Sequence, residues 1–403
     1  MDSLALSKTR LGRLHHALAA HVQSGDMPGL VALVNIRGET AVEAIGAQSF
    51  GGAPMKRDTI FRIASMTKPI IAAATLVLIE ECRLRLDDPI DDFLPELANR
   101  RVLKSLESEV DDTIQSNRPI TARDLLTFTF GLGAVMVWPA KYPIQKAMEE
   151  VGLAPGPFPL GFSNDEFMRR LGTLPLIYQP GERFLYHTGA QVLGVLIERA
   201  SGQTLEAFLQ SRLFEPLGMR DTGFHVPPGK LDRLAGAYMM HREKKELVNF
   251  DDAKASHWSK PPPFADGGGG LVSTVDDFHA FYRMILNKGL PDSSRGRERV
   301  LSRPAIDLMT SDQLTPAQRV GAELFFGHGG ASWGMGGAVV TRRTDLFTTP
   351  GRFGWDGGYG TTAYLDPAED VVGILLTQRM MESPMPPRVF RDFWTTTYQA
   401  IDE

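Results

Sequence analysis

The chain has 403 residues, of which 43% are hydrophobic and 23% charged, a composition typical of a globular protein with a large core. Its formal net charge of −5 provides no basic field, which argues against nucleic acid and anionic membranes as partners. The sequence has no run of about 18 apolar residues that would span a membrane, and residues 1–22 lack the apolar core of a signal peptide. We therefore expect a cytoplasmic protein.

The N-terminal region predicts one helix followed by a hairpin. Residues 30–36 form a β-branched run, residues 37–39 a glycine-containing turn and residues 40–45 a second run, which together predict two antiparallel strands. Apolar residues at helical spacing before them predict an amphipathic helix packed on the body of the protein: Leu6, Leu11, Leu14, Leu18 and Val22.

A buried helix is predicted from Ser65 to about Glu81. Residues 70–79 are apolar on almost every side, which is typical of a central helix, and Pro69 falls in the first turn, where a missing N–H costs little. The only cysteine, Cys82, follows this helix. An intrachain disulfide is therefore excluded, and we expect a buried structural thiol.

Residues 84–270 carry helix and turn signals, and residues 271–403 add strands again. We expect an α+β fold in which one antiparallel sheet, built from both ends of the chain and flanked by helices, forms a discontinuous domain (1–83 and 271–403). A mostly helical domain (84–270) is inserted into it, with the active site between the two. The individual predictions are helices starting at Thr121 and Thr274, helices over 164–171, 190–201 and 387–401, and strands over 337–341, 361–365 and 371–377.

Ser65 and Lys68 carry the first chemical signal, an S-x-x-K motif at the start of the buried helix. Residues i and i+3 share a helix face, so the Lys68 amine can hydrogen-bond the Ser65 hydroxyl. Burial lowers the pKa of a lysine towards that of a usable base, and the helix N–H groups favour a developing oxyanion. The motif alone is weak, because a serine at this position is also a good helix cap.

A rival nucleophile, Ser332, lies in a G-x-S-x-G segment that resembles the nucleophile elbow of α/β-hydrolases. That fold needs a helix directly after the serine and a histidine later in the chain. Glycines at 334, 336 and 337 make a poor helix start, and all nine histidines precede Ser332, the last being His328. The order Ser…Asp…His is therefore excluded.

Further segments resemble the class C β-lactamase-related serine hydrolases, and the nearest group is the carboxylesterases called family VIII. The similarity covers nearly the whole chain in the right order, and it implies the β-lactamase/penicillin-binding-protein-like fold. The segments that carry it, besides the S-x-x-K motif, are residues 84–90, 120–127, 178–189, 269–274 and 354–361.

The resemblance implies a role for several residues. Ser65 would be the nucleophile, and Tyr186, which matches the tyrosine of the family's Y-x-N motif, would share proton transfer with Lys68. The backbone N–H groups of Ser65 and Gly358 would form the oxyanion hole. Without the resemblance, Tyr186 would be read as a packed aromatic residue. Residues 355–357 (Trp-Asp-Gly) occupy the place of the family's K-T-G strand motif.

Two departures from the penicillin-recognising members stand out. Trp355 replaces a lysine that helps to hold a substrate carboxylate, and Thr188 replaces an asparagine whose amide binds an acylamino carbonyl. Aromatic residues nearby predict an apolar cleft. The candidate substrate-binding residues are Trp355, Asp356, Gly357, Thr188, Phe128 and Tyr359, with Phe130, Trp333 and residues 135–138 as further members of the cleft.

These observations predict a serine carboxylesterase that hydrolyses small, short-acyl, uncharged esters through an acyl-Ser65 intermediate. A β-lactamase, an amide or peptide hydrolase, or an acyltransferase on the same fold is the alternative, and a penicillin-binding-like module without turnover is a third. We expect neither a metal nor a cofactor, and a small-molecule ester as the partner. The sequence leaves open the oligomeric state and whether Lys68 or Tyr186 is the resting base.

Overall fold

The computed structural model describes residues 7–241, 243–292, 298–327 and 329–401. Leu6 and His328 lie outside these ranges. The centre of the fold is a seven-stranded antiparallel sheet with the strand order β2-β1-β13-β12-β11-β10-β9. Its strands are β1 (Gly29–Ile36), β2 (Glu39–Gly46), β9 (Ala331–Trp333), β10 (Ala338–Val340), β11 (Phe353–Gly357), β12 (Thr361–Asp366) and β13 (Val371–Thr377).

Both ends of the chain build this sheet, as predicted. The N-terminal hairpin turns at Arg37 and Gly38, which both adopt positive φ angles (50° and 87°), the geometry of a tight hairpin turn. Strand β1 is buried along its whole length and pairs on its other side with β13, where Leu33 faces Ile374. The predicted α+β class, with one antiparallel sheet built from both ends of the chain, is therefore confirmed.

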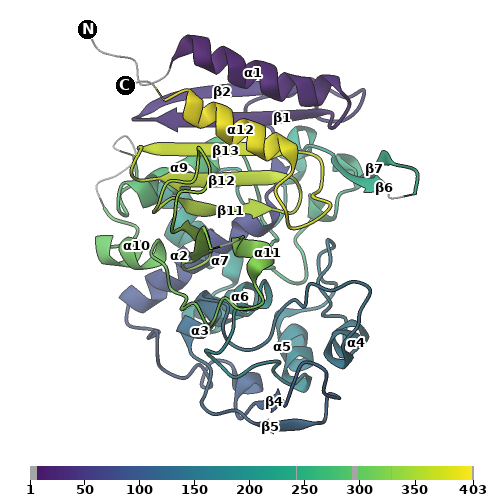
Figure 1. Cartoon of the computed structure of the whole chain (residues 1–403), viewed down its shortest axis with the longest axis vertical. Coiled ribbons are helices and arrows are strands. Elements are labelled where there is room, and N and C mark those ends of the chain that lie inside the picture. The colour runs from purple at the N-terminus through teal and green to yellow at the C-terminus, as the bar shows by residue number, and fades with distance from the viewer. Residues whose placement is uncertain (1–6, 242, 293–297, 328, 402–403) are drawn as a thin grey trace.

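Helices cover the two faces of the sheet, because alternate residues of a strand point to opposite sides. On one face, α1 (Lys8–Gln23) and α12 (Arg388–Gln399) lie side by side against Leu30 and Val34 of β1 (Figure 1). On the other face, α2 (Thr67–Glu80) and α9 (Val275–Leu286) share a core with Val31 and Leu33. The central helix predicted from its apolar sequence is thus buried, as expected.

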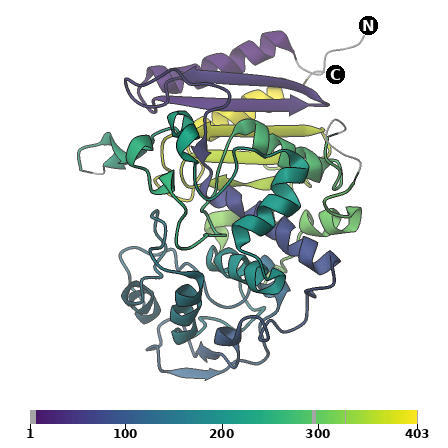
Figure 2. The same ribbon diagram turned by 180° about the vertical axis from the view of Figure 1, so that it is seen from behind.

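The remaining elements lie between β2 and β9 in the chain. Figures 1 and 2 show α3, α4, α5 and the β4–β5 ribbon at the end of the molecule opposite α1 and α12. The division into two domains at residues 83/84 and 270/271 stays a prediction. These elements are β3 (Phe61–Arg62), β4 (Arg101–Leu103), β5 (Thr113–Gln115), α3 (Ala122–Leu126), α4 (Pro143–Glu150), α5 (Asn164–Thr173), α6 (Thr188–Ser201), α7 (Leu205–Leu209), α8 (Glu215–Leu217), β6 (Ala237–His241), β7 (Glu246–Asp251), β8 (Val272–Ser273), α10 (Arg303–Met309) and α11 (Glu323–Phe326).

Two expectations near the central helix were wrong. The helix does not begin at Ser65: a 3₁₀ turn, η1 (Ala64–Met66), precedes α2, and no side chain caps either element. Cys82 is exposed rather than buried, because the chain turns sharply there with a φ of 58° after the last turn of α2. None of the helices in the described ranges has the length and apolarity that crossing a membrane requires.

Candidate active site

Ser65 lies in a short turn that its neighbours hold in an unusual conformation. Ala64 has a φ of 44°, a left-handed geometry that costs a non-glycine residue of the order of 1 kcal/mol. The Ile63 N–H donates to the Leu271 carbonyl at 3.0 Å, and the Ile63 carbonyl accepts from Thr361 Oγ1 at 3.3 Å. Leu271, directly before β8, and Thr361 of β12 thus fix the turn that presents Ser65 to a cavity.

The Lys68 side chain is 1% exposed and is held by three polar partners. Its Nζ lies 2.8 Å from Ser65 Oγ, 2.6 Å from the Gly268 carbonyl oxygen and 3.3 Å from His187 Nδ1. Burial lowers the pKa of Lys68 to about 7, against an opposing effect of the Asp266 carboxylate. The serine therefore does not act as a helix cap here, because its hydroxyl is paired with an amine that titrates near neutral pH.

Tyr186 completes the group around Ser65. Its hydroxyl hydrogen-bonds with Ser65 and accepts a hydrogen bond from Trp355 Nε1 at 2.5 Å, and the Lys68 Nζ lies 4.6 Å from the centre of its ring. Desolvation raises the pKa of the phenol well above its usual value. Tyr186 is therefore a neutral phenol at neutral pH.

Two residues of this group were missed from the sequence, His187 and Asp266. His187 precedes α6 with a φ of 84°, and burial beside Lys68 holds the pKa of its imidazole well below the usual value. Asp266 accepts a hydrogen bond from the Gly268 N–H at 2.7 Å, and desolvation raises the pKa of its carboxyl group. The sequence offered one signal for each residue: His187 lies between Tyr186 and Thr188, and Asp266 directly precedes four glycines.

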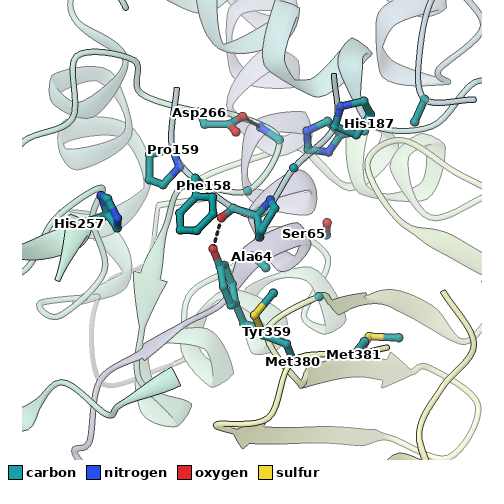
Figure 3. Close-up of a pocket in the computed structure, with 18 of the residues that line it drawn as sticks. Ala64, Ser65, Phe158, Pro159, His187, His257, Asp266, Tyr359, Met380 and Met381 are labelled. Atoms are coloured by element: carbon teal, nitrogen blue, oxygen red, sulfur yellow. Dashed lines mark hydrogen bonds between the residues drawn. The ribbon is translucent and has the colours of Figure 1, made fainter. Parts of the chain in front are cut away.

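A cavity of about 290 Å³ opens above Ser65 (Figure 3). Most of its wall is apolar, and no lysine or arginine of the described residues lines it. Its wall includes Ser65, Trp138, residues 155–159, Tyr186, His187, Asp266, Gly268, Gly358 and Tyr359.

One wall is a proline-rich segment, residues 155–159, which we call the strap. The Tyr359 hydroxyl donates to the Pro157 carbonyl, the contact drawn as a dashed line in Figure 3. The Phe158 ring stacks on Phe250 with ring centres 4.8 Å apart, although 56% of its surface is exposed. Trp138, which is 64% exposed, also lines the cavity. The strap thus bridges to strand β7 and to the turn between β11 and β12.

The predicted site residues fall into two groups. Ser65, Tyr186, Gly358 and Tyr359 line the cavity, and Lys68 lies directly below Ser65. A Cβ atom at Gly358 would meet nothing within 4 Å, so the backbone there faces open space. The second group does not line the cavity: Phe128, Thr188, Trp355, Asp356 and Gly357.

The residues of the second group support the cavity from behind. Trp355 is 8% exposed and reaches the cavity only through its hydrogen bond to Tyr186. Phe128 is fully buried and packs its ring against Trp333, with the ring centres 5.0 Å apart. Burial raises the pKa of Asp356 to about 6, against a hydrogen bond from Thr362.

The remaining two members of that group are tied to backbone positions. Thr188 is the buried first residue of α6. A Cβ atom at Gly357 would come within 2.4 Å of the Ile63 carbonyl, so glycine allows β11 to pack closely against the turn that holds Ser65.

The rival serine is excluded by its position. Ser332 is fully buried in β9 and donates its hydroxyl to Asp312. No histidine hydrogen-bonds it among the residues that the structure describes. In the same ranges, no group of three His, Cys, Asp or Glu side chains is placed to hold a metal ion.

Comparison with known proteins adds three findings. A family model described as Beta-lactamase matches residues 14–391. Protein Rv1367c of Mycobacterium tuberculosis is 37% identical over 336 residues, which cover 81% of this chain and 79% of that protein. Esterase EstB of Burkholderia gladioli is 31% identical over 383 residues, which cover 89% and 88% of the two chains.

Solved structures share the fold. EstCE1, described as a hydrolase with promiscuous acyltransferase activity, superposes with a TM-score of 0.79 over 97% of this chain and 99% of its own chain. The two sequences are 24% identical, so this likeness shows the architecture alone.

Proposed function

Since the chain belongs to the Beta-lactamase family, we propose that it is a serine carboxylesterase that forms an acyl-enzyme on Ser65. The observation that supports this most is the 2.8 Å contact between Lys68 Nζ and Ser65 Oγ at the base of an apolar cavity. The relationship to Esterase EstB is consistent with it.

In acylation, Ser65 Oγ attacks the ester carbonyl carbon and its proton moves to Lys68. Lys68 is the resting base, because its pKa lies near 7 whereas that of the Tyr186 phenol is raised by desolvation. The N–H groups of Ser65 and Gly358 stabilise the oxyanion of the tetrahedral intermediate. When the C–O bond breaks, the Tyr186 hydroxyl protonates the departing alkoxide and is reprotonated by Lys68.

Deacylation runs the same steps with water. A water molecule gives a proton to the same Lys68–Tyr186 pair as its oxygen attacks the acyl carbon, and Ser65 Oγ departs with a returned proton. The acid is released and the amine of Lys68 is neutral again. Proton transfer of this kind contributes about 10² to 10⁴ in rate.

The cavity wall favours a small uncharged ester. No arginine, and no lysine other than Lys68 beneath Ser65, is placed in the described ranges to neutralise a substrate carboxylate at this site. A volume of about 290 Å³ holds roughly ten non-hydrogen atoms, at about 30 Å³ each, as for molecules of liquid water. This volume suits a short acyl group with part of an alcohol. The absence of a cation from the described wall disfavours the anionic β-lactams.

The test is the Ser65→Ala variant with p-nitrophenyl butyrate as substrate. We expect kcat/KM to fall by about 10³-fold or more, because the covalent route is lost. Treatment of the unmodified protein with a fluorophosphonate, followed by mass spectrometry, should add one phosphonyl group at Ser65. Retained esterase activity in the variant would sink the proposal.

Acyl transfer to an alcohol is the second candidate, and the promiscuous acyltransferase activity of EstCE1, which shares this fold, is consistent with it. The same acyl-Ser65 would be attacked by an alcohol in place of water. Product analysis of p-nitrophenyl butyrate turnover with added butanol separates the two: a butyl ester that dominates over butyrate at low alcohol concentration would assign transfer.

A further inference from the structure

The turn at residues 266–270, which comes after β7 in the chain and leads into β8, contacts the amine of Lys68. The Lys68 Nζ donates to the Gly268 carbonyl at 2.6 Å, which is shorter than its contact with Ser65. Glycine is required at this position, because a Cβ atom would lie 2.9 Å from His187 Cε1 and from Gln191 Cγ. The direction of the Gly268 carbonyl therefore decides where the amine of Lys68 points.

Asp266 shapes this turn with both its side chain and its backbone. Its Oδ1 accepts from the Gly268 N–H at 2.7 Å, and its carbonyl oxygen accepts from the N–H groups of Gly269 and Gly270 at 3.2 and 2.8 Å. The Gln191 amide, on α6, donates to Oδ2 at 3.3 Å. One residue thus organises a turn that has no side chains of its own.

We propose that Asp266 is a positioning residue for the reaction on Ser65: it orients the Gly268 carbonyl towards Lys68 and places a carboxylate near the amine. The inference rests on the proposed function. Its carboxylate favours the protonated amine, so Lys68 keeps enough proton affinity to accept the Ser65 proton despite being buried. Asp266 thus acts on Lys68 in two ways: it holds the Gly268 carbonyl in place through a hydrogen bond, and its charge stabilises the protonated amine.

Other groups that face Lys68 do not supply this charge. His187 Nδ1 is 3.3 Å from the amine, but its imidazole stays neutral because burial and Lys68 lower its pKa. Tyr186 stays a neutral phenol, as does Tyr359, which also faces Asp266 and whose pKa is raised by burial. Among the described residues, Asp266 is the one carboxylate that acts on the charge of Lys68.

The experiment measures the second-order rate of phosphonylation of Ser65 by a fluorophosphonate between pH 5 and pH 9. In the unmodified protein the rate should rise with pH through about 7, as Lys68 loses its proton. Asp266→Asn keeps an oxygen for the Gly268 N–H but removes the charge, so the rise should move to lower pH by about one unit. Asp266→Ala should lose about 10-fold or more at every pH, because the turn is released.

Asp277→Asn is the matched control, since Asp277 is a buried carboxylate that accepts hydrogen bonds from the Asp221 N–H and from Thr222 and does not line the cavity. If Asp266→Asn does not fold, Gln191→Leu tests the same point. The loss of the amide donor raises the pKa of Asp266, so less negative charge lies near Lys68 and the pH profile should move to lower pH by a smaller amount. An unchanged pH profile in the folded variant would overturn the inference. An unmodified protein that fails to react would instead overturn the proposed function.

Discussion

The base and the strap of the cavity are held in opposite ways. At the base, Lys68 has three polar partners within 3.3 Å and almost no exposed surface. The strap, residues 155–159, is tied to the facing wall by one hydrogen bond from Tyr359 and by the stacking of Phe158, a ring that is more than half exposed. Several bonds fix each group at the base, whereas few contacts fix the strap.

This difference suggests that the base of the cavity determines whether the reaction occurs and that the strap determines which ester is preferred. The proposed proton transfer between Ser65, Lys68 and Tyr186 needs positions fixed to a fraction of an ångström, which redundant hydrogen bonds provide. A wall with few ties can change without disturbing them, because segments with few buried contacts open at low free energy. Changes at the base should therefore abolish turnover, and changes at the strap should alter which ester is preferred.

The largest effect is expected from Lys68→Met, which keeps the length and buried volume of the side chain but removes the base. We expect kcat/KM for p-nitrophenyl butyrate to fall by about 10³-fold. The melting temperature should not fall, because a buried amine is replaced by an apolar group. Lys104→Met is the control, since Lys104 pairs with Asp112 on the far β4–β5 ribbon and should leave activity unchanged. Equal losses in the two variants would contradict the assigned base.

An intermediate effect is expected from Trp355→Phe, which removes the hydrogen bond to Tyr186 from behind the cavity. Because this bond lowers the pKa of the phenol, its loss should make Tyr186 a weaker proton donor and reduce kcat by about 10-fold, with KM little changed. Trp394→Phe removes the same type of donor, to Thr362 Oγ1 at 3.1 Å, on the other face of the sheet. A similar loss of kcat in that variant would assign the effect to folding rather than to Tyr186.

The smallest effect on basal rate is expected from Tyr359→Phe, which releases the strap. One neutral hydrogen bond contributes about 1 kcal/mol, so the open strap should become about fivefold more populated. We expect kcat/KM for p-nitrophenyl octanoate to rise severalfold relative to that for the acetate. Tyr282→Phe, which loses a hydrogen bond to the Ala363 carbonyl in the core, is the matched control. An unchanged ratio of the two substrates in Tyr359→Phe would show that the strap does not set acyl-chain size.

Local patterns were sufficient for several elements of the fold, but not for the short strands β4, β5, β6 and β7, which lie where only helices and turns were predicted. Runs of β-branched residues predicted β1, β2, β12 and β13, and a segment that is apolar on almost every side predicted α2. These patterns are local because a buried strand or helix is built from apolar residues along its own sequence. The i,i+3 spacing also predicted the contact between Lys68 and Ser65, which depends only on helix geometry.

The rest of the site depends on contacts between residues far apart in the chain, which a local sequence pattern does not predict. His187 and the Gly268 carbonyl reach Lys68 from segments about 120 and 200 residues away in the chain. Trp355 was expected to face the substrate, but its side chain points to the layer behind Tyr186. Phe128 was expected in the cleft, but its ring fills the aromatic core around Trp333.

The pairing of β1 with β13 has a consequence for biosynthesis. Leu33 leaves the ribosome long before its partner Ile374, and Gly357 of β11, which packs on the turn before Ser65, is also made late. Until then, β1 exposes an unpaired edge of apolar residues, a state prone to aggregation that slows folding. The turn that holds Ser65 can therefore be completed only after β11 and β13 have been made, and we expect a chain that stops before them to be inactive.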